Sequence, residues 1–290
     1  MAELVASLAP SRNKRNMRTS NRRRRAITLS IVLGAILLAA LVAGLTMPPE
    51  FYTSDFTQKQ QAPNAVHWFG TDFLGHDMFC FSIRGLALSI VIGLFASAVS
   101  GFVALLLGSI SAVCGGWVDK VILWLADLLM SIPHLVMLLL ISFAVGGGTF
   151  GVVLAVALTH WPSLTRVIRA EVLRIRTGEY VAASRAMGKT DLWIAWHHVI
   201  PNVMPQFIVG TILLFPHAIL HESALTFLGF GLPLDSPAIG AILSSSMKYL
   251  ATGAWWLALF PGLMMVAIVL LAFTLGDDIK QLTDPQTVQE

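Results

Sequence analysis

Apolar residues gather in six long runs along this chain, and shorter polar segments separate them. A helix that crosses the hydrocarbon core of a bilayer needs roughly 20 apolar residues, and the runs come close to that length. The pattern therefore predicts an all-α membrane protein with six transmembrane helices. The predicted spans cover about residues 26–46, 86–114, 121–145, 150–167, 204–228 and 255–275.

The first run, residues 26–46, is longer than the roughly 7 to 15 apolar residues of a signal-peptide core. No convincing cleavage site of small residues follows it, so we expect it to remain as a membrane anchor. Because the number of predicted spans is even, both termini are expected on the same side of the membrane.

Lysine and arginine are divided unequally between the two sides that these spans define. Of the 19 residues of these types, 16 lie on the side of the termini, 8 of them in the first 25 positions. Only Lys59, Arg84 and Lys248 lie on the other side. Since cytoplasmic loops carry the excess of positive charge, both termini are predicted to be cytoplasmic.

Two segments are too long to be simple turns between spans, an outward loop and an inward segment that leaves the membrane. Long loops of this kind usually have a role of their own. The expected organisation is a basic tail at 1–25, an anchor at 26–46, an outward loop at 47–83, a core at 84–276 with an inward loop at about 169–203, and a cytoplasmic tail at 277–290.

Composition narrows the classes of function. Of the 290 residues, 56% are hydrophobic and 12% are charged, and the mean hydropathy is +0.75. Soluble domains carry about 25% charged residues, so a cytosolic enzyme, a disordered scaffold and a nucleic-acid-binding module are excluded. The only cysteines, Cys80 and Cys114, are too few for a disulfide framework and are expected to pack as small free thiols.

The inward segment predicts two short helices joined by a turn. Ala182, Ala183 and Ala186 form a small-residue helical face, and Gly188 interrupts the helix. Thr190 or Asp191 is suited to cap the second helix. An apolar stripe follows, and Pro201 is expected to end that helix. The stripe consists of Leu192, Ala195, Trp196 and Val199.

From these residues alone, two interpretations of the inward segment stay open. It is either an amphipathic cap at the membrane interface or a docking surface for a partner. A small-residue face allows a partner to approach closely, and Trp193 and Trp196 could lie on that partner or on the membrane interface.

The inward segment resembles the "EAA" signature of permease subunits of bacterial ATP-binding-cassette importers, whose loop forms coupling helices that dock on a cytoplasmic ATPase. Ala183, Gly188 and Pro201 match the signature, and Ile200 replaces its Leu. Two positions depart from it, because Ala182 stands where the signature has Glu and Ser184 where it has its second Ala. Glu179, three residues before Ala182, is a candidate to supply the acidic group instead.

Further elements are similar to the dipeptide, oligopeptide and nickel permease subfamily, and the C-type member of its permease pair fits best. They are Phe69-Gly-Thr-Asp-Phe-Leu-Gly-His-Asp77, Gly115-Gly-Trp-Val-Asp119, the segment Glu222 to Gly231, Phe260-Pro-Gly262, and Gly276-Asp-Asp278 with Asp284-Pro285. The resemblance implies the six-helix fold of a type I importer permease with a cytoplasmic two-helix coupling loop. It assigns ATPase coupling to Glu179, Ala182, Ala183, Gly188, Ile200 and Pro201.

Several positions depart from the subfamily pattern and leave the cargo open. His76 stands where an Arg is usual, residues 78–83 lack the usual Ser-Arg pair, and the fifth span adds Pro216, His217 and His221. The resemblance is compatible with peptide cargo and, as an alternative, with nickel or a metal chelate.

Ionisable residues inside spans are functional candidates because desolvation makes them costly. Asp127 is expected to pair with an arginine of a neighbouring helix, His134 to pack beside a kink at Pro133, and His160 to be hydrogen-bonded beside Pro162.

His217 and His221 are four residues apart and share a helix face, with Glu222 adjacent. These three residues are candidates for the translocation path. Two imidazoles with a carboxylate could bind nickel or zinc transiently, so His217 and His221 are also metal candidates. Simple packing and a proton-linked gate remain alternatives, whereas a metalloprotease site is excluded because the second His of HExxH is missing.

The chain has no P-loop of the form GxxxxGK[ST], so no ATPase site is assigned to it. The resemblance implies a transport subunit with no cofactor of its own, because ATP and Mg would be bound by partner ATPase subunits. It implies as partners a second permease subunit, two ATPase subunits and an extracytoplasmic solute-binding protein. An intramembrane enzyme and a channel are the remote alternatives.

Overall fold

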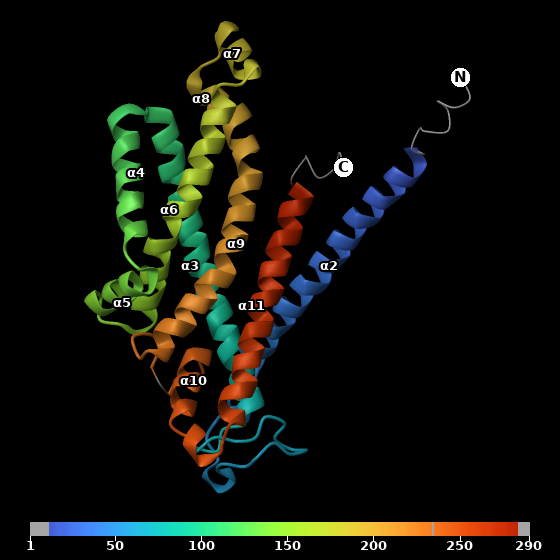
Figure 1. The fold of residues 1–290 in the computed structure, drawn as a ribbon, viewed down its shortest axis with the longest axis vertical. Coiled ribbons are helices and arrows are strands. Elements are labelled where there is room, and N and C mark those ends of the chain that lie inside the picture. The colour runs from blue at the N-terminus through green and yellow to red at the C-terminus, as the bar shows by residue number, and fades with distance from the viewer. Residues whose placement is uncertain (1–11, 234, 284–290) are drawn as a thin grey trace, which may run out of the picture.

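The protein is an elongated bundle of helices in the computed structural model, which describes residues 12–233 and 235–283 (Figure 1). Within these residues β-structure is limited to one isolated antiparallel bridge, between Thr71 and Asp77. The predicted all-α class is therefore confirmed. Residues 1–11 of the basic tail and the Asp284-Pro285 element lie outside the described residues.

Seven long helices and three short ones make up the bundle in the described ranges. The long helices are α2 (Arg12–Thr46), α3 (Met78–Cys114), α4 (Gly116–Ser131), α5 (His134–Ala144), α6 (Gly148–Arg176), α9 (Ile200–Phe227) and α11 (Trp256–Thr283). The short helices are α7 (Glu179–Ala186), α8 (Asp191–Ile194) and α10 (Ile239–Met247).

In the part of the chain that the structure describes, five helical segments are long and apolar enough to cross a membrane, and the count reaches six if the bent pair α4 and α5 forms one span. The third span predicted at 121–145 consists of two helices, and the kink expected at Pro133 is a bend of 100° between them. Pro133 explains the break. The residue before a proline is driven into extended backbone, and Ile132 has φ −88° and ψ 137°.

Most helices extend beyond the predicted apolar runs. The second span begins at Met78 rather than near residue 86, because the Asp77 side chain caps α3 by accepting from two backbone amides. The fourth span continues to Arg176 and the sixth to Thr283. Polar residues prolong these helices past the length that a bilayer requires, which hydropathy alone does not reveal.

Helix α3 is the centre of the bundle and packs against α2, α6 and α9. Its small residues allow this close approach. A methyl group added at Gly108 would lie 2.8 Å from the Thr165 carbonyl oxygen and 2.9 Å from Ile168, and one at Gly93 would lie 2.8 Å from Ile219. The helices on both sides of α3 therefore contact its backbone almost directly.

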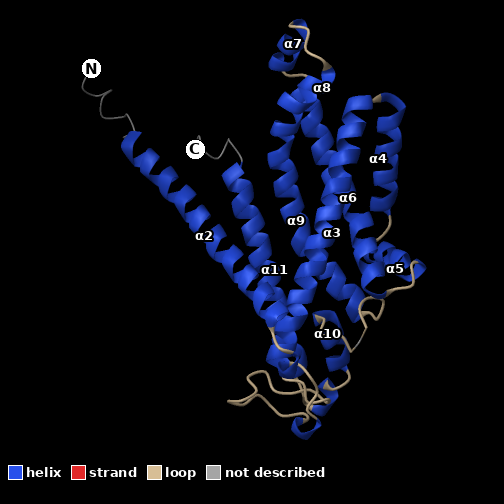
Figure 2. Ribbon diagram, turned by 180° about the vertical axis from the view of Figure 1, so that it is seen from behind, coloured by secondary structure: helices blue, strands red, loops and turns tan. Residues whose placement is uncertain are grey.

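The two ends of the bundle differ. Helices α7 and α8 lie at the same end as the start of α2 and the end of α11, while residues 47–77 form the opposite end (Figures 1 and 2). Helix α2 diverges from the bundle and contacts α3 and α11. The short helix α10, which the hydropathy pattern did not predict, packs against α9 and α11. It lies toward the end that residues 47–77 form (Figure 2).

Candidate functional site

The inward segment folds into the two predicted helices, and a glycine forms the turn between them. Gly188 has φ +77°, a left-handed conformation that glycine adopts without a steric penalty. Its N–H donates to the Arg185 carbonyl at 2.9 Å, and the Lys189 N–H donates to the Ser184 carbonyl at 3.1 Å. The Thr190 hydroxyl oxygen then accepts from the Trp193 N–H and caps α8.

Buried contacts fix this loop on the ends of α6 and α9. Val181 and Ile194 are buried in one cluster with Ile175 of α6 and Val203 of α9. Ser184 donates to the Tyr180 carbonyl, and its hydroxyl lies 2.9 Å from Nε2 of His198. The loop is therefore a rigid extension of two membrane helices, since hydrophobic burial holds both of its short helices.

The outer surface of the loop carries small and apolar side chains beside charged ones such as Arg185 and Asp191. Ala182, Ala183 and Ala186 are exposed as predicted. Three large apolar side chains also face away from the protein. They are Met187, Leu192 and Trp196, which are 69%, 71% and 63% exposed. Apolar side chains clustered in this way on a surface mark an interaction site.

Pro201 does not end the second helix, so that prediction is wrong. The chain stays helical from Asp191 to Phe227, because residues 195–199 form a π-turn in which the Ile200 N–H donates to the Ala195 carbonyl. A π-turn holds one extra residue, and Pro201 is accommodated in the first turn of α9. Ile200 and Pro201 remain exposed.

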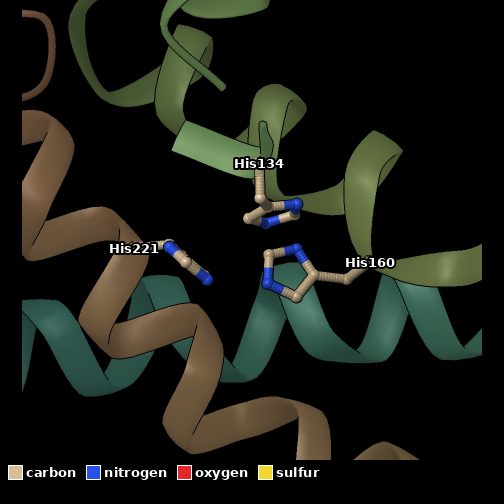
Figure 3. A group of neighbouring side chains, drawn as sticks. All are labelled: His134, His160 and His221. Atoms are coloured by element: carbon tan, nitrogen blue, oxygen red, sulfur yellow. The ribbon is translucent and has the colours of Figure 1, made fainter. Parts of the chain in front are cut away.

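The histidines of the fifth span do not form the site that their spacing suggests. His221 lies in a cluster with His134, the first residue of α5, and with His160 of α6 (Figure 3). The three ring centroids are 4.5 to 5.1 Å apart. His217 instead packs edge-on against Phe273 of α11, with 5.0 Å between ring centroids.

Glu222 organises the end of α9. Its side chain is fully buried, and its carboxylate accepts from the Thr226 hydroxyl at 3.0 Å and from the Ser223 hydroxyl at 3.2 Å. The Thr226 oxygen accepts in turn from the Leu232 N–H at 3.2 Å. Any side chain at Gly231 would clash with Thr226. Glu222 and Gly231 of the family-like element are thus parts of one hydrogen-bonded turn.

Two ion pairs join α4 to α6. Asp119 accepts from Arg169 through both carboxylate oxygens at 2.6 Å, and Asp127 pairs with Arg166. The expected arginine partner of Asp127 is therefore confirmed. The Asp119 pair has the bidentate geometry that makes arginine–carboxylate contacts strong, and it positions the family-like element around residues 115–119.

Hydrogen bonds to carboxylates build the end of the bundle that residues 47–77 form. Asp77 caps α3 and accepts from His67 Nδ1 at 2.6 Å. Asp72 accepts from the amides of Leu74 and His76 and from His76 Nδ1 at 2.7 Å. His76, which stands where the subfamily usually has Arg, therefore donates a hydrogen bond to a carboxylate, as His67 does.

The adjoining turn at Asp55 is held by the same kind of bond. The hydroxyl group and the backbone N–H of Thr57 both donate to the Asp55 carboxylate. These two bonds lower the pKa of Asp55 below its usual value.

A family model described as "Binding-protein-dependent transport system inner membrane component" matches residues 104–287. The match covers more than half of the chain, including the loop of residues 179–201 and all three clustered histidines. The chain belongs to this family.

Relatives extend the likeness of this permease to nearly the whole chain. A Brucella suis biovar 1 protein named as a peptide permease is 33% identical over 284 residues, which cover 98% of this chain and 93% of the relative. The oligopeptide transport system permease protein OppC of Bacillus subtilis is 31% identical over 257 residues, covering 88% of this chain and 84% of the relative.

The fold has a match among solved structures. The permease superposes on an inward-facing structure of the MetNI methionine ABC transporter with a TM-score of 0.57 and 19% identity, covering 71% of this chain and 98% of the other. The protein is thus a multi-pass inner-membrane permease subunit of an ABC importer with the type I fold. As in its family, it works in a complex with ATPase and permease partners.

The sequence predicts the two short helices on either side of Gly188, which the structure contains, but not the association of the three histidines. His134 and His160 were each explained separately, and His221 was grouped with His217. The available signal was that each lies in an apolar run, where an ionisable side chain needs a partner. Because the three histidines are far apart along the chain, the sequence does not indicate that they are partners of one another.

Proposed function

We propose that this permease forms half of the translocation path of a small-peptide importer, together with a second homologous permease subunit. In this proposal two cytoplasmic ATPase subunits bind ATP and Mg and supply the energy, and an extracytoplasmic solute-binding protein delivers the peptide. The permease itself contributes no catalytic group and no cofactor. The names of the peptide and oligopeptide permease relatives support this choice of cargo.

The observation that carries the proposal is the projecting loop formed by α7 and α8 (Figure 1). Its exposed residues include the whole set that the family signature assigns to ATPase coupling. They are Glu179, Ala182, Ala183, Gly188, Ile200 and Pro201. A rigid loop with exposed apolar side chains suits a firm contact with a partner, because little conformational entropy is lost when it docks.

The end that carries this loop is the cytoplasmic end in the proposal. The start of α2 and the end of α11 lie at that same end, and 16 of the 19 Lys and Arg belong to segments on that side. The positive-inside rule supports this orientation, in which an ATPase can reach the loop.

The opposite end is where the solute-binding protein is proposed to dock. A cavity of about 410 Å³ opens between residues 50–68 and the start of α3. Its lining combines aromatic and acidic side chains, among them Phe51, Trp68, Glu50 and Asp55. Acidic groups at an entrance suit the amino terminus of a peptide, since opposite charges attract across a partly desolvated surface.

Coupling follows from the way in which the loop is attached. When ATP closes the ATPase pair, the two loops that dock on it move together, and each pulls on the ends of α6 and α9. Rocking of the two permease subunits then exchanges inward-open and outward-open states. Glu222 and the histidines lie on the helices that would move, which makes His217, His221 and Glu222 candidates for the path.

Thiol labelling in intact cells tests the orientation on which the proposal depends. A membrane-impermeant thiol reagent is expected to label Gln60→Cys and not Lys189→Cys, with the parent protein setting the background from Cys80 and Cys114. Labelling of Lys189→Cys would contradict the proposed sidedness. Peptide-stimulated ATP hydrolysis by the reconstituted complex tests the cargo, and stimulation by no peptide of two to five residues would contradict peptide import.

A further inference from the structure

Three histidines from separate helices meet inside the permease beside the break between α4 and α5 (Figure 3). His134 begins α5 directly after Pro133, His160 lies in the middle of α6, and His221 lies in α9. One nitrogen of each ring lies within 4.8 Å of a nitrogen of the other two. Nothing in the proposed peptide path requires three imidazoles at this point.

The hydrogen bonding of His160 leaves one of its nitrogens free. Nδ1 lies 2.8 Å from the Val156 carbonyl oxygen, and a carbonyl can only accept, so Nδ1 carries the hydrogen. The neutral ring then has a lone pair on Nε2. Histidines that bind metal commonly show this arrangement, because a backbone carbonyl fixes the ring while the other nitrogen binds the ion.

Two buried nitrogens of the cluster lack a hydrogen-bond partner among the described residues, Nε2 of His134 and Nε2 of His160. A buried polar atom without a partner costs roughly 1–3 kcal/mol, and such atoms are uncommon in native proteins. The rings of the three histidines face one another in Figure 3. An electron-pair acceptor placed between them would satisfy these nitrogens together.

We propose that His134, His160 and His221 form a binding site for a divalent late transition-metal ion such as zinc, nickel or cobalt. Imidazole nitrogen is a favoured ligand for these ions, whereas Mg²⁺ and Ca²⁺ prefer oxygen. Among the described residues the cluster contains neither a carboxylate nor a thiolate. Three neutral ligands leave the fourth tetrahedral position open to water or to a group of the cargo.

The geometry needs only a modest contraction to hold an ion. Metal–nitrogen bonds of about 2.0–2.1 Å in a tetrahedral site keep the ligand nitrogens about 3.4 Å apart. The present upper limit of 4.8 Å falls to that value through small rotations of the rings. His134 and His221 are only partly buried, so both side chains have room to turn.

Binding would tie the break in the third span to two other helices. His134 is the first residue after the bend of 100°, and His160 and His221 belong to α6 and α9, the helices that carry the coupling loop. A bound ion therefore links the position of α5 to the two helices that the ATPase moves. This consequence rests on the proposed function, whereas binding of the ion itself does not.

Cobalt titration of the purified transporter complex tests the site, because tetrahedral Co²⁺ has characteristic visible absorption. We expect one Co²⁺ per permease in the parent protein. His160→Ala should weaken binding by more than the roughly 10- to 100-fold that loss of a supporting outer contact costs. The matched control is His217→Ala, one turn from His221 on α9, which should bind as the parent does.

Two results would overturn the proposal. Unchanged binding in His160→Ala would show that the ion lies elsewhere, for instance at His197 and His198. Loss of binding in His217→Ala would favour the pair of His217 and His221 instead.

A third variant is expected to gain a spectroscopic band. Its result therefore does not depend on a loss of cobalt binding, which misfolding could also cause. In His134→Cys a thiolate would replace one imidazole, so bound Co²⁺ should show a new sulfur-to-metal charge-transfer band. The parent, which retains Cys80 and Cys114, should lack it. Absence of the band in an assembled, cobalt-loaded variant would exclude His134 as a ligand.

Titration of the parent protein with the aqueous ion and with a cobalt–peptide chelate separates a resident ion from one that arrives with cargo. Tighter binding of the aqueous ion indicates a resident ion, and tighter binding of the chelate indicates an ion that arrives with cargo.

Discussion

The coupling loop and the histidine cluster are built in opposite ways. The loop is made of consecutive residues, 179–201, and most of its side chains are exposed. The cluster takes one residue from each of three helices, and Nε2 of His134 and Nε2 of His160 are buried in the bundle. In the proposed function the loop presents its surface to another protein, whereas the cluster and Glu222 connect parts of this one.

This contrast predicts two separable kinds of defect. Changes on the outer surface of the loop should weaken the contact with the ATPase and leave the permease as stable as before. Changes to buried polar groups should lower the free energy of unfolding and leave the docking surface intact. Variants in both regions, ranked by expected effect, show whether the two properties are independent.

The largest effect is expected from Glu222→Ala. It removes the acceptor of the Thr226 and Ser223 hydroxyls, and the loss should lower the free energy of unfolding by about 1–3 kcal/mol. Glu222→Gln keeps an oxygen acceptor and should lose less. Thermal unfolding of the purified permease measures both. Equal stability of Glu222→Ala and the parent would mean that these hydrogen bonds contribute nothing net.

The next effect is expected from Gly188→Val on the coupling side. Left-handed backbone costs a residue with a side chain roughly 1–2 kcal/mol, so the turn should open and misplace α7 relative to α8. Peptide-stimulated ATP hydrolysis should fall by roughly 5- to 30-fold, the factor that corresponds to this energy. Gly253→Val is the matched control, because Gly253 also has positive φ and open space around it but lies far from the loop. Equal losses in both variants would make the effect one of general strain.

Trp196→Ala sharpens the same comparison without changing the backbone. Trp196 and Trp124 are both 63% exposed, but Trp196 lies on the loop and Trp124 on the side of α4. Tryptophans at interface centres often contribute at least about 1 kcal/mol to binding. Titration of ATPase subunits into permease in nanodiscs should show weaker binding for Trp196→Ala and parent-like binding for Trp124→Ala. The opposite pattern would place the docking surface on α4.

The contrast also explains what the sequence could and could not predict. Every signal for the coupling loop is local. The alanine spacing, the turn at Gly188 and the cap at Thr190 act within a few residues, and all three were predictable. Pro201 misled because its effect depends on the π-turn before it, which the spacing of apolar residues does not show.

The interior was harder to predict for physical reasons. A hydropathy window averages over about a full span, so it treats residues 121–145 as one run, and the kink expected from Pro133 carries no information on the size of the bend, which is 100°. It also passed over α10, which is too short to cross a membrane. The histidines meet only through tertiary packing. Helical spacing places His217 and His221 on one face of α9. In the structure His217 contacts Phe273 of α11, whereas His221 contacts His134 at the break between α4 and α5.

The smallest effect is expected at the outer end, in the turn held by Asp55. Its pKa lies below the usual value because Thr57 donates to the carboxylate, so the bonds stabilise the turn at neutral pH. That contribution disappears as the pH falls through the lowered pKa. Hydrogen exchange at Thr57, corrected for its intrinsic rate, should lose protection at acidic pH in the parent. Asp55→Asn cannot ionise, and a pH dependence like the parent's in this variant would assign the effect to another group.

The unbroken helical path from Asp191 to Phe227 has a mechanical consequence. It contains 37 residues and, at a rise of about 1.5 Å per residue, is about 55 Å long. One end carries the docking surface and the other carries His221 and Glu222. A tilt of about 5° around one end would displace the other by about 5 Å, more than the diameter of a water molecule. In the proposed coupling mechanism the helix is therefore a lever, through which a small rotation at the ATPase would open or close a passage at the far side of the membrane.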